Sequence, residues 1–242
     1  MTRYQFPEGF FWGAAASGPQ TEGSACKAHR SIWDSWFAEQ PERFYQQIGP
    51  QSVCETYSKF KDDVKRMKQT GFNSFRTSIQ WSRLIDDFET GAPNAEAVQF
   101  YHDYFDEMIA NGIEPMINLY HFDMPEALQK QYGGFESSYV TELFSRFART
   151  AFELFGHKVK YWITFNEPIV PVEGGYLYDF HYPCKKNGKL AAQVAFNIML
   201  AHAKAVQVYR ELELPGEIGV VLNLTPSYTR NDSEEDKKAA WY

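Results

Sequence analysis

The stretch that decides the fold is Tyr161-Trp162-Ile163-Thr164-Phe165-Asn166-Glu167-Pro168. Its first five residues are aromatic or β-branched, and a short run of this kind is typical of a buried parallel strand. Asn166 and Glu167 then place an amide and a carboxyl group where the strand opens onto solvent. Because the carboxyl ends of the strands carry the chemistry in an α/β barrel, Glu167 is a candidate catalytic group. The alternative interpretation is that Glu167 only caps the following turn.

The same alternation of strand and helix recurs along the chain. Further strands are predicted at residues 10–17, 73–81, 114–120 and 217–224, and helices at 55–69, 95–110, 138–155 and 190–212 separate successive strands. This order predicts right-handed βαβ units and a parallel sheet. Residues 1–242 are therefore interpreted as a single α/β domain.

Two architectures fit such a sheet, an open doubly wound sheet and a closed barrel. The turn after the first predicted strand lacks the G-x-G-x-x-G spacing of dinucleotide-binding sheets, and no G-x-x-x-x-G-K-[ST] loop occurs in the sequence. The barrel is favoured because polar residues follow nearly every strand, where they are expected to converge at one end: Gln20 and Glu22, Arg76 to Arg83, His121 and Asp123, Asn166 and Glu167, and Asn223.

A complete (β/α)8 barrel requires eight strands, whereas about five of the eight βα units are predicted here. The sequence ends in a predicted helix that begins near Glu234, after the capping residue Ser233. We therefore expect the chain to be the N-terminal portion of an incomplete TIM barrel.

Composition and charge narrow the range of functions that the chain could have. With 44% apolar residues among 242, the chain has enough apolar side chains for a core. The net charge of −7 comes without a basic stripe, which argues against nucleic acid and anionic membranes as partners. The three cysteines, Cys26, Cys54 and Cys184, show no disulfide or zinc spacing, and the sequence contains no signal peptide and no run of about 18 apolar residues, so a cytoplasmic location is expected. The histidines form no H-E-x-x-H motif, and neither a metal nor a cofactor is expected.

Four segments together resemble the motifs of family 1 glycoside hydrolases in order and spacing: residues 6–23, 75–83, 120–125 and 164–168. The resemblance covers essentially the whole chain, but only the first half of the family's usual length. It implies a (β/α)8 barrel that hydrolyses β-glycosides with retention of configuration. The implied partner is a small-molecule β-glycoside.

The resemblance also implies roles for individual residues. Glu167 matches the general acid/base, and Gln20, His121 and Asn166 match residues that hydrogen-bond the non-reducing sugar. Retaining hydrolysis uses two carboxyl groups about 5–5.5 Å apart, and Arg76 is interpreted as the cation that keeps the nucleophilic carboxylate ionised. The family's nucleophile motif, similar to Thr-Glu-Asn-Gly, does not occur in the sequence. The chain alone is therefore expected to have no appreciable turnover.

The substrate is less well determined by the sequence. The loop at residues 174–183 and the pair His121-Phe122 resemble the bacterial members that act on 6-phosphorylated sugars, which favours a 6-phospho-β-glucosidase. The alternatives are a plain β-glucosidase or β-galactosidase, and a non-catalytic sugar-binding or interaction fragment that self-associates through exposed strand edges. Trp12, Trp33, Trp36, Trp81 and Tyr120 could stack on sugar rings, although core packing is the commoner role of aromatic residues.

Overall fold

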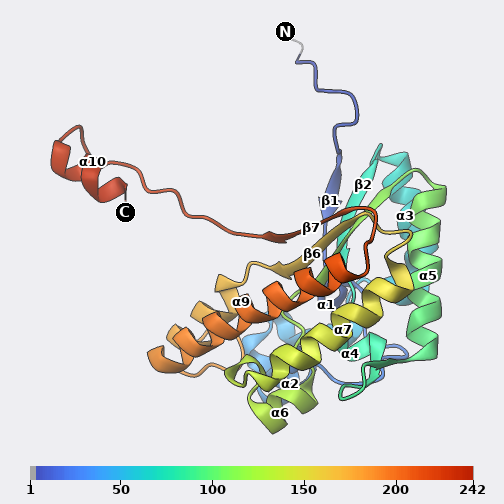
Figure 1. Cartoon of the computed structure of the whole chain (residues 1–242), viewed down its shortest axis with the longest axis horizontal. Coiled ribbons are helices and arrows are strands. Elements are labelled where there is room, and N and C mark those ends of the chain that lie inside the picture. Colours follow the sequence, from blue (N-terminus) through green and yellow to red (C-terminus); the bar gives the residue numbers. More distant parts are fainter. Residues whose placement is uncertain (1–3, 242) are drawn as a thin grey trace.

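The computed structural model describes residues 4–241, and its main feature is a parallel sheet (Figure 1). The five strands are ordered β1-β2-β5-β6-β7, and their bounds are Gly13–Ala15 (β1), Ser74–Ser78 (β2), Glu114–Tyr120 (β5), Tyr161–Asn166 (β6) and Glu217–Val221 (β7). Each neighbouring pair is parallel, as the alternation of elements predicted. The arrangement is that of an incomplete (β/α)8 barrel.

Four long helices connect successive strands and cover the sheet. They are α3 (Thr56–Gln69), α5 (Ala95–Ala110), α7 (Tyr139–Phe155) and α9 (Gly188–Glu211). Figure 1 shows α7 and α9 lying side by side and α3 next to α5. Asn94 and Asn187 cap the amino ends of α5 and α9 by accepting hydrogen bonds from backbone N–H groups.

The core lies between this helical layer and the central strands. The apolar stripe of α7 is buried at Phe144, Phe147, Phe152 and Phe155, and the ring of Phe152 packs edge-to-face on Trp162 of β6 with 4.9 Å between ring centroids. Ile117 and Leu119 of β5 are likewise fully buried. Of the five aromatic residues considered as sugar platforms, Trp36, Trp81 and Tyr120 are buried core residues.

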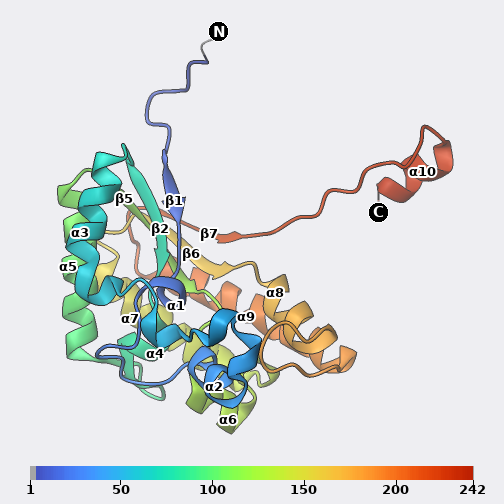
Figure 2. The same ribbon diagram turned by 180° about the vertical axis from the view of Figure 1, so that it is seen from behind.

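The outer strands are shorter than the sequence predicts. In place of residues 10–17, only Gly13–Ala15 form β1; at Trp12 the carbonyl still accepts from the backbone N–H groups of Asn73 and Ser74, but the N–H donates to the side chain of Asn73. β1 approaches β2 so closely that a Cβ at Gly13 would lie 1.9 Å from the Ser74 carbonyl oxygen. β7 ends at Val221, and the following segment leads away from the sheet to α10 (Glu234–Ala240) in both views (Figures 1 and 2).

Several short elements that the sequence analysis did not resolve gather at the carboxyl ends of the strands (Figure 2). They are the helices α1 (Gly18–Thr21), α2 (Ile32–Glu39), α4 (Trp81–Leu84), α6 (Glu126–Tyr132) and α8 (Ile169–Val172), a π-helix at Glu173–Leu177, 3₁₀ turns at residues 41–43, 45–47, 50–52 and 134–136, and the hairpin β3 (Ile85–Asp87) and β4 (Ala92–Pro93). Within residues 4–241 no helix is both long and apolar enough to cross a bilayer.

Candidate functional site

The last residues of β5 and β6 depart from strict alternation in the same way. In β6, Thr164 hydrogen-bonds His202 of α9, and the next residue, Phe165, packs on Phe144 of α7 at 4.8 Å, so two consecutive side chains contact the helical layer. The register with β7 shifts at this point, because three steps from Ile163 to Asn166 match two steps from Gly219 to Val221. This bulge places Asn166 on the face opposite the helices.

β5 shows the corresponding three-residue spacing. The side-chain amide of Asn118 lies 3.2 Å from Nδ1 of His121, so these two residues share a face. Between them, Leu119 is fully buried and Tyr120 packs on Phe135 and Phe165. His121 and Asn166 therefore both leave their strands toward the inner face of the sheet.

A residue with positive φ follows each of these strand ends. Phe122, directly after His121, has a φ of 64°, and Glu167, directly after Asn166, has a φ of 43°. This conformation is unfavourable for a residue with a side chain, and such residues cluster at functional sites. The turn at Glu167 is held by its N–H, which donates to the Val221 carbonyl at 2.8 Å, and by its carbonyl, which accepts from Val170 at 2.9 Å.

Unpaired buried polar atoms mark the inner face next to these turns. Within the described part of the chain, Nε of Arg76, Oδ1 of Asn118 and Oδ1 of Asn166 are buried and have no hydrogen-bond partner. Each such atom costs about 1–3 kcal/mol if it stays unpaired, and in native proteins it calls for an explanation. We call Arg76, Asn118, His121, Asn166 and Glu167 the unpaired cluster.

Electrostatics links the members of this cluster. Burial lowers the pKa of Arg76, while the negative charge of Glu167 acts in the opposite direction. Burial also lowers the pKa of His121 to about 4, and the positive charge of Arg76 adds to this decrease. His121 is therefore neutral near pH 7; because its Nδ1 faces the donating amide of Asn118, its proton lies on Nε2, which is free to donate to a ligand.

Asp123 fixes the backbone around His121. Its fully buried carboxylate accepts hydrogen bonds from the backbone N–H of Trp81 at 2.9 Å and of His121 at 3.1 Å. Burial raises the pKa of Asp123 to about 6, although these two hydrogen bonds act the other way. Asp123 thus joins the start of α4 to the end of β5.

Glu22 and Arg83, also expected at this end of the barrel, form a separate group with Gln80 and Tyr101 in which each charge has a partner; we call Glu22, Gln80, Arg83 and Tyr101 the paired cluster. Oε2 of Glu22 lies 2.7 Å from Nε of Arg83 and accepts a hydrogen bond from Gln80, and Oε1 accepts one from Tyr101. Glu22 is 2% exposed and Arg83 is 0% exposed. Glu22 and Arg83 were expected to converge with the other polar residues at the carboxyl ends of the strands; there they are buried and paired with each other.

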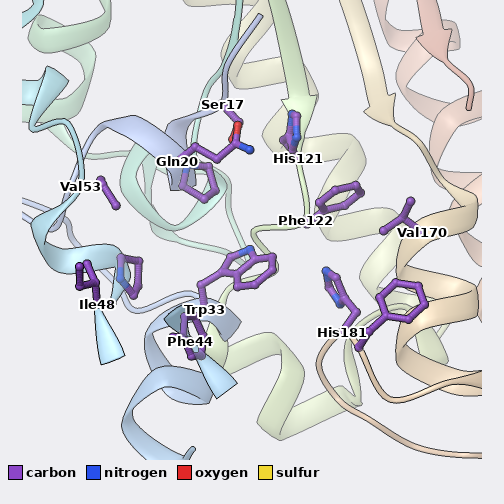
Figure 3. A pocket seen from close by; sticks show the side chains of 14 residues that line it. Ser17, Gln20, Trp33, Phe44, Ile48, Val53, His121, Phe122, Val170 and His181 are labelled. Carbon is purple, nitrogen blue, oxygen red and sulfur yellow. The ribbon is translucent and has the colours of Figure 1, made fainter. Parts of the chain in front are cut away.

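A cavity of about 420 Å³ opens beside the unpaired cluster (Figure 3), which is within the usual size range of small-molecule sites. Gln20 and His121 line one side of it, and Trp33, Phe44 and His181 line the other. Gln20 is exposed, and its Oε1 accepts a hydrogen bond from Ser17 at 2.8 Å. Arg76, Asn166 and Glu167 are not among the residues that line this cavity, but Val170, whose N–H donates to the Glu167 carbonyl, is.

The structure therefore divides the predicted residues between the cavity and the neighbouring group around Arg76. Gln20 and His121 share the cavity, while Arg76 lowers the pKa of His121 and is itself influenced by the charge of Glu167. The sequence analysis missed Asn118, Phe44 and His181. Asn118 could have been found from its place three residues before His121, whereas no local signal marks Phe44. In residues 4–241 no group of three or more His, Cys, Asp or Glu is arranged to hold a metal ion.

Comparison with known proteins gives consistent matches. The profile of glycosyl hydrolase family 1 matches residues 2–241. A 6-phospho-beta-glucosidase of Bacillus subtilis strain 168, GmuD, is 52% identical over 239 residues, which are 98% of this chain and 51% of the relative. Beta-glucosidase 24 of Oryza sativa subsp. japonica is 38% identical over 257 residues, covering 99% of this chain and 51% of the relative.

Solved structures show the same relationship. The family 1 β-glucosidase from Thermotoga maritima superimposes with a TM-score of 0.90 at 36% identity, over 98% of this chain and 53% of that structure. A mutant rice β-glucosidase in a covalent complex with glucose gives a TM-score of 0.90 at 29% identity, over 98% and 52%. The chain thus spans about half the length of the relatives that it matches.

Proposed function

Because the chain belongs to glycosyl hydrolase family 1, we propose that it supplies one half of a retaining β-glycosidase site, with Glu167 as the general acid and base. The observation that carries this proposal is the placement of Glu167. Glu167 follows the bulge of β6 in a left-handed conformation, and its charge counteracts the lowering of the Arg76 pKa. Its carbonyl accepts a hydrogen bond from Val170, which lines the cavity.

The remaining residues of the unpaired cluster support a role in holding the sugar. Nε2–H of His121 and the amide of Gln20 can donate to neighbouring hydroxyl groups, and the unpaired Oδ1 of Asn166 can accept from one. A contact with the 2-hydroxyl would strengthen as the sugar gains oxocarbenium character. Glu167 would first protonate the departing oxygen and then deprotonate the attacking water.

Arg76 suits a second carboxylate. Its Nε has no partner within residues 4–241, and the negative charge of Glu167 only partly offsets the lowering of the Arg76 pKa by burial. A nucleophilic carboxylate placed against this guanidinium would stay ionised. The sequence offers no second strand-ending Glu of the kind that Glu167 represents, so the chain alone is expected to lack the glycosylation step.

For the substrate we propose a 6-phospho-β-glucoside. This is supported by the 52% identical relative, which is named a 6-phospho-beta-glucosidase. A plain β-glucoside or β-galactoside is the alternative, because relatives at 36–40% identity are named β-glucosidases. A non-catalytic sugar-binding role is also compatible with the cavity. Self-association through the edge strands β1 and β7, which are largely exposed, is proposed as well.

The test compares the chain with a chimera that joins it to the second half of the Bacillus subtilis relative. We expect the chimera to hydrolyse 4-nitrophenyl β-glucoside 6-phosphate faster than its unphosphorylated counterpart, and the chain alone to show no steady turnover. Glu167→Gln in the chimera should lower kcat/KM on the order of 10²–10⁴-fold, because a general acid contributes about that much.

Leaving groups provide the control for this effect. The 2,4-dinitrophenolate group leaves without protonation. Glu167→Gln should therefore lower kcat/KM for a 2,4-dinitrophenyl glycoside much less than for a phenyl glycoside. An equal loss with both would show that Glu167 does not act as the acid. Steady hydrolysis by the 242-residue chain itself, abolished by Glu167→Gln, would contradict the need for a second carboxylate from elsewhere.

A further inference from the structure

Thr164 begins the motif at residues 164–168, and the proposed function leaves it without a role. Its side chain is fully buried. The hydroxyl oxygen lies 2.7 Å from Nδ1 of His202 on α9 and 3.1 Å from the carbonyl oxygen of Gly219 on β7. Thr164 therefore joins three elements, α9, β6 and β7, through one hydroxyl group.

These two contacts determine where the protons lie. A carbonyl oxygen only accepts, so the contact with Gly219 is a hydrogen bond only if the Thr164 hydroxyl donates to it. The hydroxyl then has no second proton to give, so Nδ1 of His202 donates to the hydroxyl oxygen. Burial lowers the pKa of His202, so its ring is neutral near pH 7 and Nε2 keeps a lone pair. We call this chain of two hydrogen bonds, from His202 through Thr164 to Gly219, the hydroxyl relay.

α9 provides a fixed support for His202. The side-chain amide of Asn197, which precedes His202 in the helix, is fully buried and donates to the Phe135 carbonyl at 2.7 Å. Ala201 and Ala205 follow Asn197 by one and two turns, and both are fully buried. Because α9 is packed before and after His202, its imidazole can hold a side chain of β6 in one position.

The hydroxyl relay lies where the pairing of β6 with β7 becomes irregular. Gly219, which accepts the last hydrogen bond of the relay, belongs to the last regular pair before the bulge. The bulge requires Thr164 and Phe165 to contact the helical layer in succession, whereas strict alternation would place them on opposite faces. Packing on Phe144 holds Phe165 there, and the relay holds Thr164. Without the relay, one of the two contacts that favour the bulged register would be lost.

We propose that Thr164 and His202 are positioning residues, and that their hydroxyl relay fixes the bulge of β6 and thereby the inward direction of Asn166 and the turn at Glu167. Neither Thr164 nor His202 is among the residues that line the cavity, so they act through the strand. The inference rests on the proposed function only in naming Asn166 a sugar-binding residue and Glu167 the acid and base.

The first test determines the tautomer of His202 in the unmodified chain. With ¹⁵N-labelled histidines, long-range ¹H–¹⁵N correlation spectra at about pH 8, where the ring is neutral, distinguish a proton on Nδ1 from one on Nε2. The signal that disappears in His202→Gln belongs to His202. We expect the proton on Nδ1. A proton on Nε2 would overturn the relay, because Thr164 would then donate to His202 and not to Gly219.

The second test follows the bulge by hydrogen exchange. The amide of Glu167 donates to the Val221 carbonyl at 2.8 Å in the bulged register. Its exchange rate is divided by that of the Ile79 amide, which donates to the Asn118 carbonyl at 3.0 Å, so that a global loss of stability cancels. Thr164→Val removes the hydroxyl with little change in shape and should raise this ratio about tenfold, the effect of one lost hydrogen bond. His202→Phe should raise it less, because Thr164 can still donate to Gly219.

Two variants are the controls for this effect. Thr164→Ser keeps the hydroxyl and should leave the ratio within about twofold of the unmodified chain. Thr141 is also fully buried and donates its hydroxyl to the Ser138 carbonyl at 2.7 Å. Thr141→Val therefore removes a comparable bond far from the bulge and should likewise leave the ratio within about twofold. An unchanged ratio in Thr164→Val or His202→Phe, or an equal rise in Thr141→Val, would overturn the positioning role. The tautomer test needs no folded Thr164→Val.

These outcomes also separate the hydroxyl relay from the proposed function. If the exchange ratio responds as expected but Glu167→Gln leaves kcat/KM of the chimera unchanged, the relay stands and the glycosidase role of Glu167 fails. If Glu167→Gln lowers kcat/KM while the ratio responds to neither Thr164→Val nor His202→Phe, the glycosidase role stands and the relay fails.

Discussion

The paired cluster and the unpaired cluster use similar residues at the same end of the sheet but in opposite ways. In the paired cluster, Glu22 and Arg83 are buried against each other at 2.7 Å, and neighbouring groups take up their remaining hydrogen-bonding capacity. In the unpaired cluster, Arg76, Asn118 and Asn166 keep buried polar atoms without partners inside the described chain. The difference shows that a charged residue at a strand end identifies a ligand site only when its neighbours leave it unsatisfied.

The largest effect is expected from breaking the paired cluster. Arg83→Met leaves Glu22 buried without its cation, which should lower the free energy of unfolding by about 3–5 kcal/mol. The double variant Glu22→Gln with Arg83→Met should recover part of this loss, because it removes the stranded charge as well. Urea unfolding followed by tryptophan fluorescence measures both. A loss below about 1 kcal/mol for Arg83→Met would show that the pair does not hold the barrel end together.

Asp123 lies between the two clusters. Its titration and that of His121 should make the free energy of unfolding depend on pH. The folded pKa of Asp123 is raised, so its stabilising contribution is present below about pH 3.8 and is lost as the pH rises through about 6. The folded pKa of His121 is lowered, so its contribution is present above about pH 6.5 and is lost as the pH falls through about 4. Between about pH 4 and 6, Asp123 therefore makes the free energy of unfolding fall as the pH rises, whereas His121 makes it rise.

Removing either group should expose the slope of the other. Asp123→Asn should make the change of unfolding free energy with pH more positive by up to about 1.4 kcal/mol per pH unit, and His121→Asn should make it more negative by a similar amount. Urea midpoints at several pH values between about 4 and 6 measure these slopes. Parallel curves for both variants and the unmodified chain would show that neither group titrates differently on folding.

The smallest effect on stability is expected at Arg76. Arg76→Met removes a cation that gains little from its surroundings, so the free energy of unfolding should change by less than about 1 kcal/mol, as it should for the exposed control Arg66→Met. Only Arg76→Met should raise the pKa of His121 toward its ordinary value, because Arg76 lowers it in the folded chain. Titration of the His121 resonance by NMR distinguishes the two. A destabilisation comparable to Arg83→Met would remove the contrast between the clusters.

Much of the fold could be predicted because its signals are local. The helix at Ala95–Ala110 and the strand at Glu114–Tyr120 have the predicted bounds, since apolar periodicity and turn residues mark them. The first strand was predicted too long because Phe10 and Trp12 look like strand residues, yet they are partly exposed and pack on each other at 4.8 Å between ring centroids.

The residues of the candidate site also differ in whether a local sequence signal marks them. Glu167, Asn166 and His121 stand at strand ends that the sequence marks, so their approximate placement could be predicted. His181 could not, because its position depends on a π-helix that Gly174 permits and on contacts with Trp33, about 150 residues earlier in the chain. The sequence analysis singled out Arg76, but no local sequence signal shows that Arg83 has a carboxylate within 2.7 Å while Nε of Arg76 is left unpaired across residues 4–241.

The bulge in β6 determines which side chains at the end of this strand face the inner side of the sheet. One extra residue between Ile163 and Asn166 is what turns an amide inward where alternation would have turned it toward the helices. If the same residues paired regularly without the bulge, Phe165 would lie on the inner face and Asn166 would turn toward the helices, so the sheet could persist while its reactive end became apolar. The position of the bulge therefore determines which side chain at the end of β6 faces the inner side of the sheet.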